Sequence, residues 1–175
     1  MFSCSSGFTI GWNRQTAGAL RPDLREEHGV FYLVWQGRRL RGLNAEMRGF
    51  EGERVELKTV DGEQAGYEGI LPRKIGPWYM APAAEWNGGA NREDGACDVR
   101  YSVSKSLTGP RTRRRRGVPH GGHSTLFQDR AGRWHPAFFG NGGTAPFRAM
   151  PGIVRLDIQD TGSDLLIGPA PVGQP

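Results

Sequence analysis

One short phrase recurs three times along this chain, and its recurrence limits the fold more than any other feature of the sequence. Each copy places a glycine two residues before an aromatic residue that is followed by tyrosine or histidine, and the copies begin at Gly29, Gly76 and Gly132. They lie 47 and 56 residues apart. Self-similarity at periods of this size is typical of repeat folds, including the blades of β-propellers.

The residues around each copy favour short strands. Each phrase opens a run rich in strand-forming side chains, which predicts strands at 30–35, 78–84 and 134–139. Further strands are predicted at 38–43, 54–59, 99–104 and 153–158. In the third copy a hairpin turn is predicted at 129–132, just before the strand.

Composition agrees with this pattern of strands. The 27 glycines and 12 prolines among 175 residues suit many tight turns better than long helices. We therefore predict an all-β fold of about three propeller blades of antiparallel strands, with a β-sandwich as the alternative.

No apolar run is long enough for a spanning helix, so no membrane partner is expected. No signal peptide is visible, and the compartment stays open.

Two further features of composition are interpreted as structural. Cys4 and Cys97 lie far apart in the sequence, without the spacing of a zinc site, and they are expected to be free thiols. The arginines between 111 and 116 are expected to form a solvated loop between blades. A nucleic-acid interface there would need interleaved aromatic residues, which this run lacks, so no nucleic-acid partner is expected.

Three ionisable residues occupy one position of the repeat. Arg21, Glu68 and His123 each stand eight or nine residues before the glycine of their phrase. The first strand of each propeller blade lines the central channel, so equivalent positions meet on one axis. The shared position therefore predicts a polar site at that axis, although each residue alone is more often a solvated or structural one.

Nearby aromatic and amide side chains suit a sugar. Aromatic faces cover the apolar faces of sugar rings, and amides bind the ring hydroxyls. Trp86, Asn87 and Asn141 are the candidate contacts, together with Arg21. Four other aromatic residues are interpreted as core rather than as ligand contacts: Trp78, Tyr101, Phe138 and Phe139.

Six segments together resemble glycoside hydrolase family 43. The similar segments are 67–71, 76–80, 102–110, 121–127 with Trp134, 138–141 and 151–154. The resemblance covers residues 19–160, leaving an irregular N-terminal segment at 1–18 and a C-terminal tail at 161–175. It implies a five-bladed propeller that hydrolyses arabinose- or xylose-containing polysaccharides or oligosaccharides with inversion. Glu68 would be the general acid, and His123 would be the axial ligand of a cation or a water.

The sequence departs from the family pattern in ways that bear on activity. Inverting hydrolysis needs a second carboxylate as base. The family carries that Asp in its first blade, which we do not find in this chain, and Arg21 stands where the family has an Asp that raises the pKa of the acid. A guanidinium would instead favour the ionised form of Glu68, which is the wrong sign for an acid.

We therefore predict a truncated member of this family with impaired activity. The alternatives are a shortened relative whose base comes from elsewhere, such as a partner chain, and a non-catalytic carbohydrate-binding propeller fragment. No cofactor is required by the resemblance, which allows a central Ca²⁺ or other cation. Open blade edges predict self-association. The sugar, the linkage and endo or exo action do not follow from the sequence.

Overall fold

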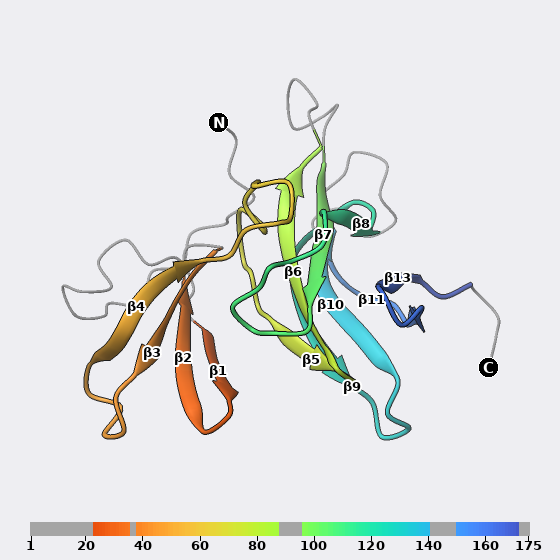
Figure 1. The fold of residues 1–175 in the computed structure, drawn as a ribbon. Coiled ribbons are helices and arrows are strands. Elements are labelled where there is room, and N and C mark those ends of the chain that lie inside the picture. Colours follow the sequence, from red (N-terminus) through yellow and green to blue (C-terminus); the bar gives the residue numbers. More distant parts are fainter. Residues whose placement is uncertain (1–22, 36–37, 88–95, 141–149, 172–175) are drawn as a thin grey trace.

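The computed structural model describes residues 23–35, 38–87, 96–140 and 150–171, and the regular elements in these ranges are all β-strands. The strands pair antiparallel and form four sheets (Figure 1). The all-β prediction is therefore confirmed. Within the described part of the chain, no helix has the length and apolar character needed to cross a membrane.

Two of the sheets have four strands in sequence order, as a propeller blade has. The first sheet consists of β1 (Asp23–Glu27), β2 (Val30–Trp35), β3 (Arg39–Leu43) and β4 (Phe50–Glu56). The second consists of β5 (Arg73–Ile75), β6 (Trp78–Trp86), β7 (Cys97–Ser104) and β8 (Arg115–Val118). The third consists of β9 (Gly121–Gln128), β10 (Trp134–Gly140) and β11 (Pro151–Ile153). A separate hairpin follows, made of β12 (Leu156–Asp160) and β13 (Leu165–Pro169).

The recurring glycine lies in the first hairpin turn of each of the three larger sheets. His28 and Gly29 between β1 and β2 both have positive φ, 53° and 81°, as a two-residue hairpin with a type I′ turn requires. Gly76 between β5 and β6 has a φ of 55°. The predicted turn before β10 is confirmed, since Gly132 donates its N–H to the carbonyl of Asp129 at 3.0 Å.

The second sheet is buried on both faces. Successive side chains of its strand β6 point in opposite directions, so β6 contributes to a hydrophobic cluster on each face. Met80 packs in one hydrophobic cluster with Phe138 of the third sheet, and the β12–β13 hairpin completes that cluster. Ala81 packs in another cluster with Val34 of the first sheet. The three sheets therefore stack face against face, with the second in the middle (Figure 1).

The expectation of a solvated arginine loop at 111–116 is confirmed only in part, because Arg113, Arg115 and Arg116 are exposed whereas the side chains of Arg111 and Arg114 are not. Arg111 is 0% exposed, and Arg115 begins β8. Three of the arginines pair with carboxylates distant in sequence: Arg113 with Asp61 at 3.3 Å, Arg114 with Glu63 at 2.7 Å and Glu85 at 2.5 Å, and Arg115 with Asp164 at 2.5 Å. The arginines of this run therefore face acidic side chains from β6 and from the segments between strands.

The free-thiol prediction is wrong for Cys97, which is fully buried and disulfide-bonded. That prediction rested on the rarity of disulfides in chains with few cysteines, which does not exclude a bond in a particular chain. Cys4 lies outside the described residues.

Three differences between the observed and the predicted strands exceed two residues. β4 begins and ends earlier than the predicted 54–59, because Thr59 leaves the sheet and bridges to Arg111 instead. The predicted strand at 153–158 divides into β11 and β12. The range expected as a tail, 161–175, contains β13, which pairs along its length with β12.

Candidate functional site

Glu68 precedes β5 in the chain and lies on the same side of β6 as that strand. It forms an isolated bridge with Ala84 of β6, and its carbonyl accepts the N–H of Ala84 at 2.9 Å. Residues directly opposite in an antiparallel pair direct their side chains to the same face. Ala84 shares its face of β6 with Trp78 and Met80, so the half-buried Glu68 lies on the face that packs against the third sheet.

His123 lies on β9, the inner strand of the third sheet, where the pairing with β10 is interrupted. Phe138 pairs with Ser124 and Phe139 pairs with Gly122, so His123 is the additional residue of a β-bulge. Bulges redirect a side chain relative to the regular alternation of a strand, and they are frequent beside functional sites. The imidazole of His123 is half-buried.

Gly69 brings these two strands together. Its φ of 62° lies in the left-handed region, and a Cβ added there would lie 2.8 Å from Cδ2 of His123. A side chain at this position would therefore clash with the imidazole. The residue next to Glu68 thus packs directly on His123, and two of the three residues predicted to share an axis come from contacting strands of neighbouring sheets.

The remaining predicted site residues divide into two groups. Arg21 and Asn141 lie outside the described residues. Trp86 ends β6 and is half-buried, and the exposed Asn87 follows it. Asn87 closes the open end of the β6–β7 pair, since its Oδ1 accepts the N–H of Ala96 at 3.0 Å and its own N–H donates to the carbonyl of Ala96 at 2.9 Å.

The structure adds an ion-pair network beside Glu68 that the sequence did not indicate. Arg114 pairs with both Glu63 and Glu85, and its guanidinium lies 5.1 Å from the ring centroid of Tyr67. Burial opposes the charge of Arg114, but the hydrogen bond to Glu63 and the charge of Glu85 outweigh burial and raise its pKa. Because Tyr67 directly precedes Glu68, this network holds the segment that carries the candidate acid.

A second unexpected residue is Asp98 of β7, which is 4% exposed. Its Oδ1 accepts the N–H of His120, a residue with a positive φ of 56°, at 2.9 Å. Asp98 therefore stabilises the turn that leads into β9 and to the bulge at His123. In the sequence, Asp98 is notable only because it precedes an apolar strand residue, Val99. That position alone does not distinguish a carboxylate that stabilises a turn from a solvated one.

The contact of Gly69 with His123 brings the segment that carries Glu68 against the strand that carries His123. No group of three or more His, Cys, Asp or Glu side chains suited to a metal occurs among the described residues. Ca²⁺ takes six to eight oxygen ligands, so the described side chains around His123 do not by themselves fit that ion. A carboxyl and an imidazole are both groups that can transfer protons or bind hydroxyls.

Comparisons by sequence find no match: no sequence model of a protein family and no curated protein matches the chain. Comparisons of structure do find similar folds. The chain is similar to the GH43 BlXynB protein from Bacillus licheniformis, with a TM-score of 0.59 and 19% identity over 87% of this chain and 32% of that one.

Two arabinanases are also similar in structure. An exo-1,5-α-L-arabinanase from a bovine ruminal metagenomic library has a TM-score of 0.61 and 17% identity over 83% of this chain and 55% of its own. An α-L-arabinanase from Cellvibrio cellulosa, solved with arabinohexaose, has a TM-score of 0.58 and 16% identity over 85% of this chain and 56% of its own. The chain spans between about a third and a little over half of the length of these three proteins. The described sheets therefore form part of a β-propeller with the fold of the family 43 glycoside hydrolases.

Proposed function

We propose that this chain is a segment of an inverting glycoside hydrolase that cleaves O-glycosidic bonds in arabinose- or xylose-containing polysaccharides or oligosaccharides. The observation that carries the proposal is the packing of Gly69 against His123, because it brings the residue next to Glu68 into contact with the neighbouring sheet. The similar structures include arabinanases and a xylan β-1,4-xylosidase. They support a pentose-containing substrate.

In the proposed reaction Glu68 donates its proton to the oxygen of the leaving group. A water attacks the anomeric carbon from the opposite face, and a carboxylate base takes the proton of that water. Trp86 and Asn87 contact the sugar, with Arg21 and Asn141 as further proposed contacts. His123 would hold a water at the axis. No second carboxylate has been assigned as base, so the proposal includes impaired activity of this chain alone.

Aryl glycosides test the catalytic part of this proposal. We expect no measurable release of nitrophenol from nitrophenyl arabinofuranosides or xylosides by the isolated chain, because one carboxyl cannot complete an inverting mechanism. Glu68→Gln tests for turnover at this site, and Glu51→Gln on the exposed strand β4 is the matched control. Turnover that Glu68→Gln abolishes and Glu51→Gln leaves intact would contradict the impaired activity and identify a competent enzyme.

The second candidate is a non-catalytic carbohydrate-binding propeller segment. It is favoured by the placement of Glu68 and His123 together without an assigned base. Titration calorimetry with arabino- and xylo-oligosaccharides separates the two candidates when it is combined with the aryl glycoside assay. Binding without turnover supports the binding module, and turnover supports the enzyme.

A further inference from the structure

A pocket lies between the turn that joins β9 to β10 and the β12–β13 hairpin, away from the axial site. Its volume is about 580 Å³, and it is open to solvent. Pockets that hold small organic ligands commonly measure about 300–1,000 Å³. The volume is therefore sufficient for one or more sugar rings.

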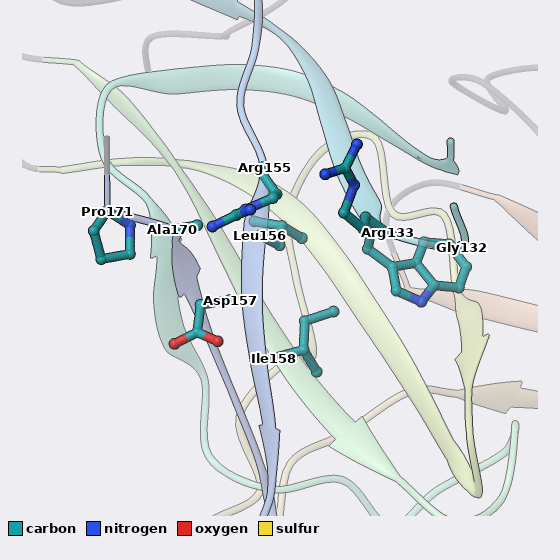
Figure 2. A pocket seen from close by; sticks show the side chains of 9 residues that line it. Gly132, Arg133, Arg155, Leu156, Asp157, Ile158, Ala170 and Pro171 are labelled. Atoms are coloured by element: carbon teal, nitrogen blue, oxygen red, sulfur yellow. The ribbon is translucent and has the colours of Figure 1, made fainter. Parts of the chain in front are cut away.

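The lining combines apolar and polar groups along β12. Trp134 and Ile158 supply apolar surface, and both pack partly into the hydrophobic core. Figure 2 shows Ile158 on one side of β12, with Arg155 and Asp157 directed toward the other side, where Pro171 lies. A ligand that contacts all of these groups must extend across the strand, which suits an oligosaccharide better than a single compact molecule.

The polar groups supply complementary hydrogen bonding. The guanidinium of Arg155 has five N–H donors, and the carboxylate of the exposed Asp157 accepts hydrogen bonds. Sugar hydroxyls both donate and accept, and their rings present apolar C–H faces that an indole covers. Arg133 also lines the pocket, but it pairs with Asp129 at 2.8 Å, and the opposite charges of Arg155 and Asp157 favour a neutral chain over an anionic one.

The wall that carries these residues is fixed to the second sheet. The N–H of Ile167 on β13 donates to the hydroxyl of Tyr101 on β7 at 2.9 Å. Arg115 of β8 pairs with Asp164 in the β12–β13 turn at 2.5 Å. The N–H of Ala170 donates to the carbonyl of Arg155 at 2.8 Å. A site on such a fixed element keeps its geometry without a ligand, which lowers the cost of binding.

The pocket is separate from the axial site. Gln128, the last residue of β9, is five positions after His123, which corresponds to about 17 Å of antiparallel strand. The pocket begins after that end, at Gly132. A polysaccharide can therefore contact both places, whereas a monosaccharide contacts one.

From this arrangement we infer that the pocket around Arg155 and Asp157 is a second binding site for a neutral arabinose- or xylose-containing polysaccharide chain. The inference rests on the proposed function and adds a surface that retains the polymer apart from the axial residues. Its effect is on affinity for long chains, while binding of a single sugar at the axis is unchanged.

Affinity electrophoresis in gels containing soluble arabinan or arabinoxylan tests this inference. Asp157→Ala and Arg155→Ala are each expected to raise the dissociation constant for the polysaccharide about tenfold, the loss of one hydrogen bond to a charged group. Glu53→Ala and Arg54→Ala on β4 are the matched controls and should migrate like the unchanged protein. Arg155→Lys keeps the charge without the planar fork and should bind with intermediate strength. Thermal melts confirm that each variant is folded.

Three results are distinguishable in this experiment. Weakened retention of the two pocket variants only, with unchanged calorimetric affinity for a monosaccharide, supports the second site. Normal retention of both pocket variants, with retention lost in Glu68→Ala, overturns the second site and leaves the proposed function standing. Absence of retention for the unchanged protein overturns both.

Discussion

Arg111 shows how much a single buried side chain contributes within the second sheet. Its side chain is 0% exposed, and its guanidinium donates to Oγ of Ser102 at 3.1 Å and to the carbonyls of Ser102, Leu107 and Tyr79. Burial lowers the pKa of Arg111 to about 10, so the group stays protonated at neutral pH. Its charge is therefore satisfied mainly by backbone carbonyls of the second sheet.

We predict that Arg111→Met lowers the free energy of unfolding by about 3 kcal/mol, because several buried carbonyls lose their donor at once. Urea denaturation followed by tryptophan fluorescence measures this change. Arg113→Met is the matched control, since the side chain of Arg113 is 78% exposed, and it should not change the midpoint measurably. Equal midpoints for the two variants would show that the hydrogen bonds of Arg111 are dispensable.

At the scale of the element, the approach of the Glu68 segment to β9 depends on a glycine. Replacing Gly69 would destabilise the fold for two reasons. Its φ of 62° disfavours any side chain, and an added Cβ would clash with His123. At Gly76 only the first reason applies, because its φ is 55° and nothing lies within 4 Å of an added Cβ. Comparing substitutions at Gly69 and Gly76 therefore isolates the effect of close packing between the sheets.

We predict that Gly76→Ala destabilises the fold by about 1 kcal/mol, from backbone strain alone. Gly69→Ala should cost about 1–3 kcal/mol more, because the imidazole must also move. Differential scanning calorimetry of the two variants measures the difference. Equal melting temperatures would mean that Gly69 and His123 are not in contact.

The elements also show what the sequence could and could not predict. The strand predicted at 30–35 coincides with β2, because a run of apolar and aromatic residues there follows a clear turn signal. β5 and β8 were missed, since each is short and begins with arginine, a residue typical of surfaces. Likewise, the burial of Arg111 depends on carbonyls from other strands, which local composition does not reveal. Glu68 was found through the repeat, whereas the partners of Arg114 come from separate strands.

At the scale of the whole molecule, the first sheet exposes one apolar surface. On the face opposite its buried core, Leu24 is 38% exposed and Phe31 is 40% exposed. The edge strand β4 is different, since charged residues occupy most of its exposed positions and its pairing with β3 contains a bulge. Charges and bulges oppose edge-to-edge pairing. The proposed self-association is therefore expected to use the exposed face as well as the edges.

We predict concentration-dependent self-association that Phe31→Glu reduces, because a carboxylate on this face resists burial. Sedimentation velocity over a range of protein concentrations measures the association. Val60→Glu is the control, since Val60 is an exposed residue of a connecting loop and its replacement should leave association unchanged. A monodisperse monomer at every concentration would contradict the self-association.

The central claim is that Glu68 and His123 belong to one sugar-binding site, and a double-mutant cycle tests it most directly. The affinity for an arabino-oligosaccharide is measured by titration calorimetry for the unchanged protein, Glu68→Gln, His123→Gln and the double variant. The account predicts weaker binding by each single variant and a coupling energy of about 1 kcal/mol, well above the roughly 0.5 kcal/mol within which distant sites add. Additive effects, or affinities that neither change alters, would show that the two residues do not share a site.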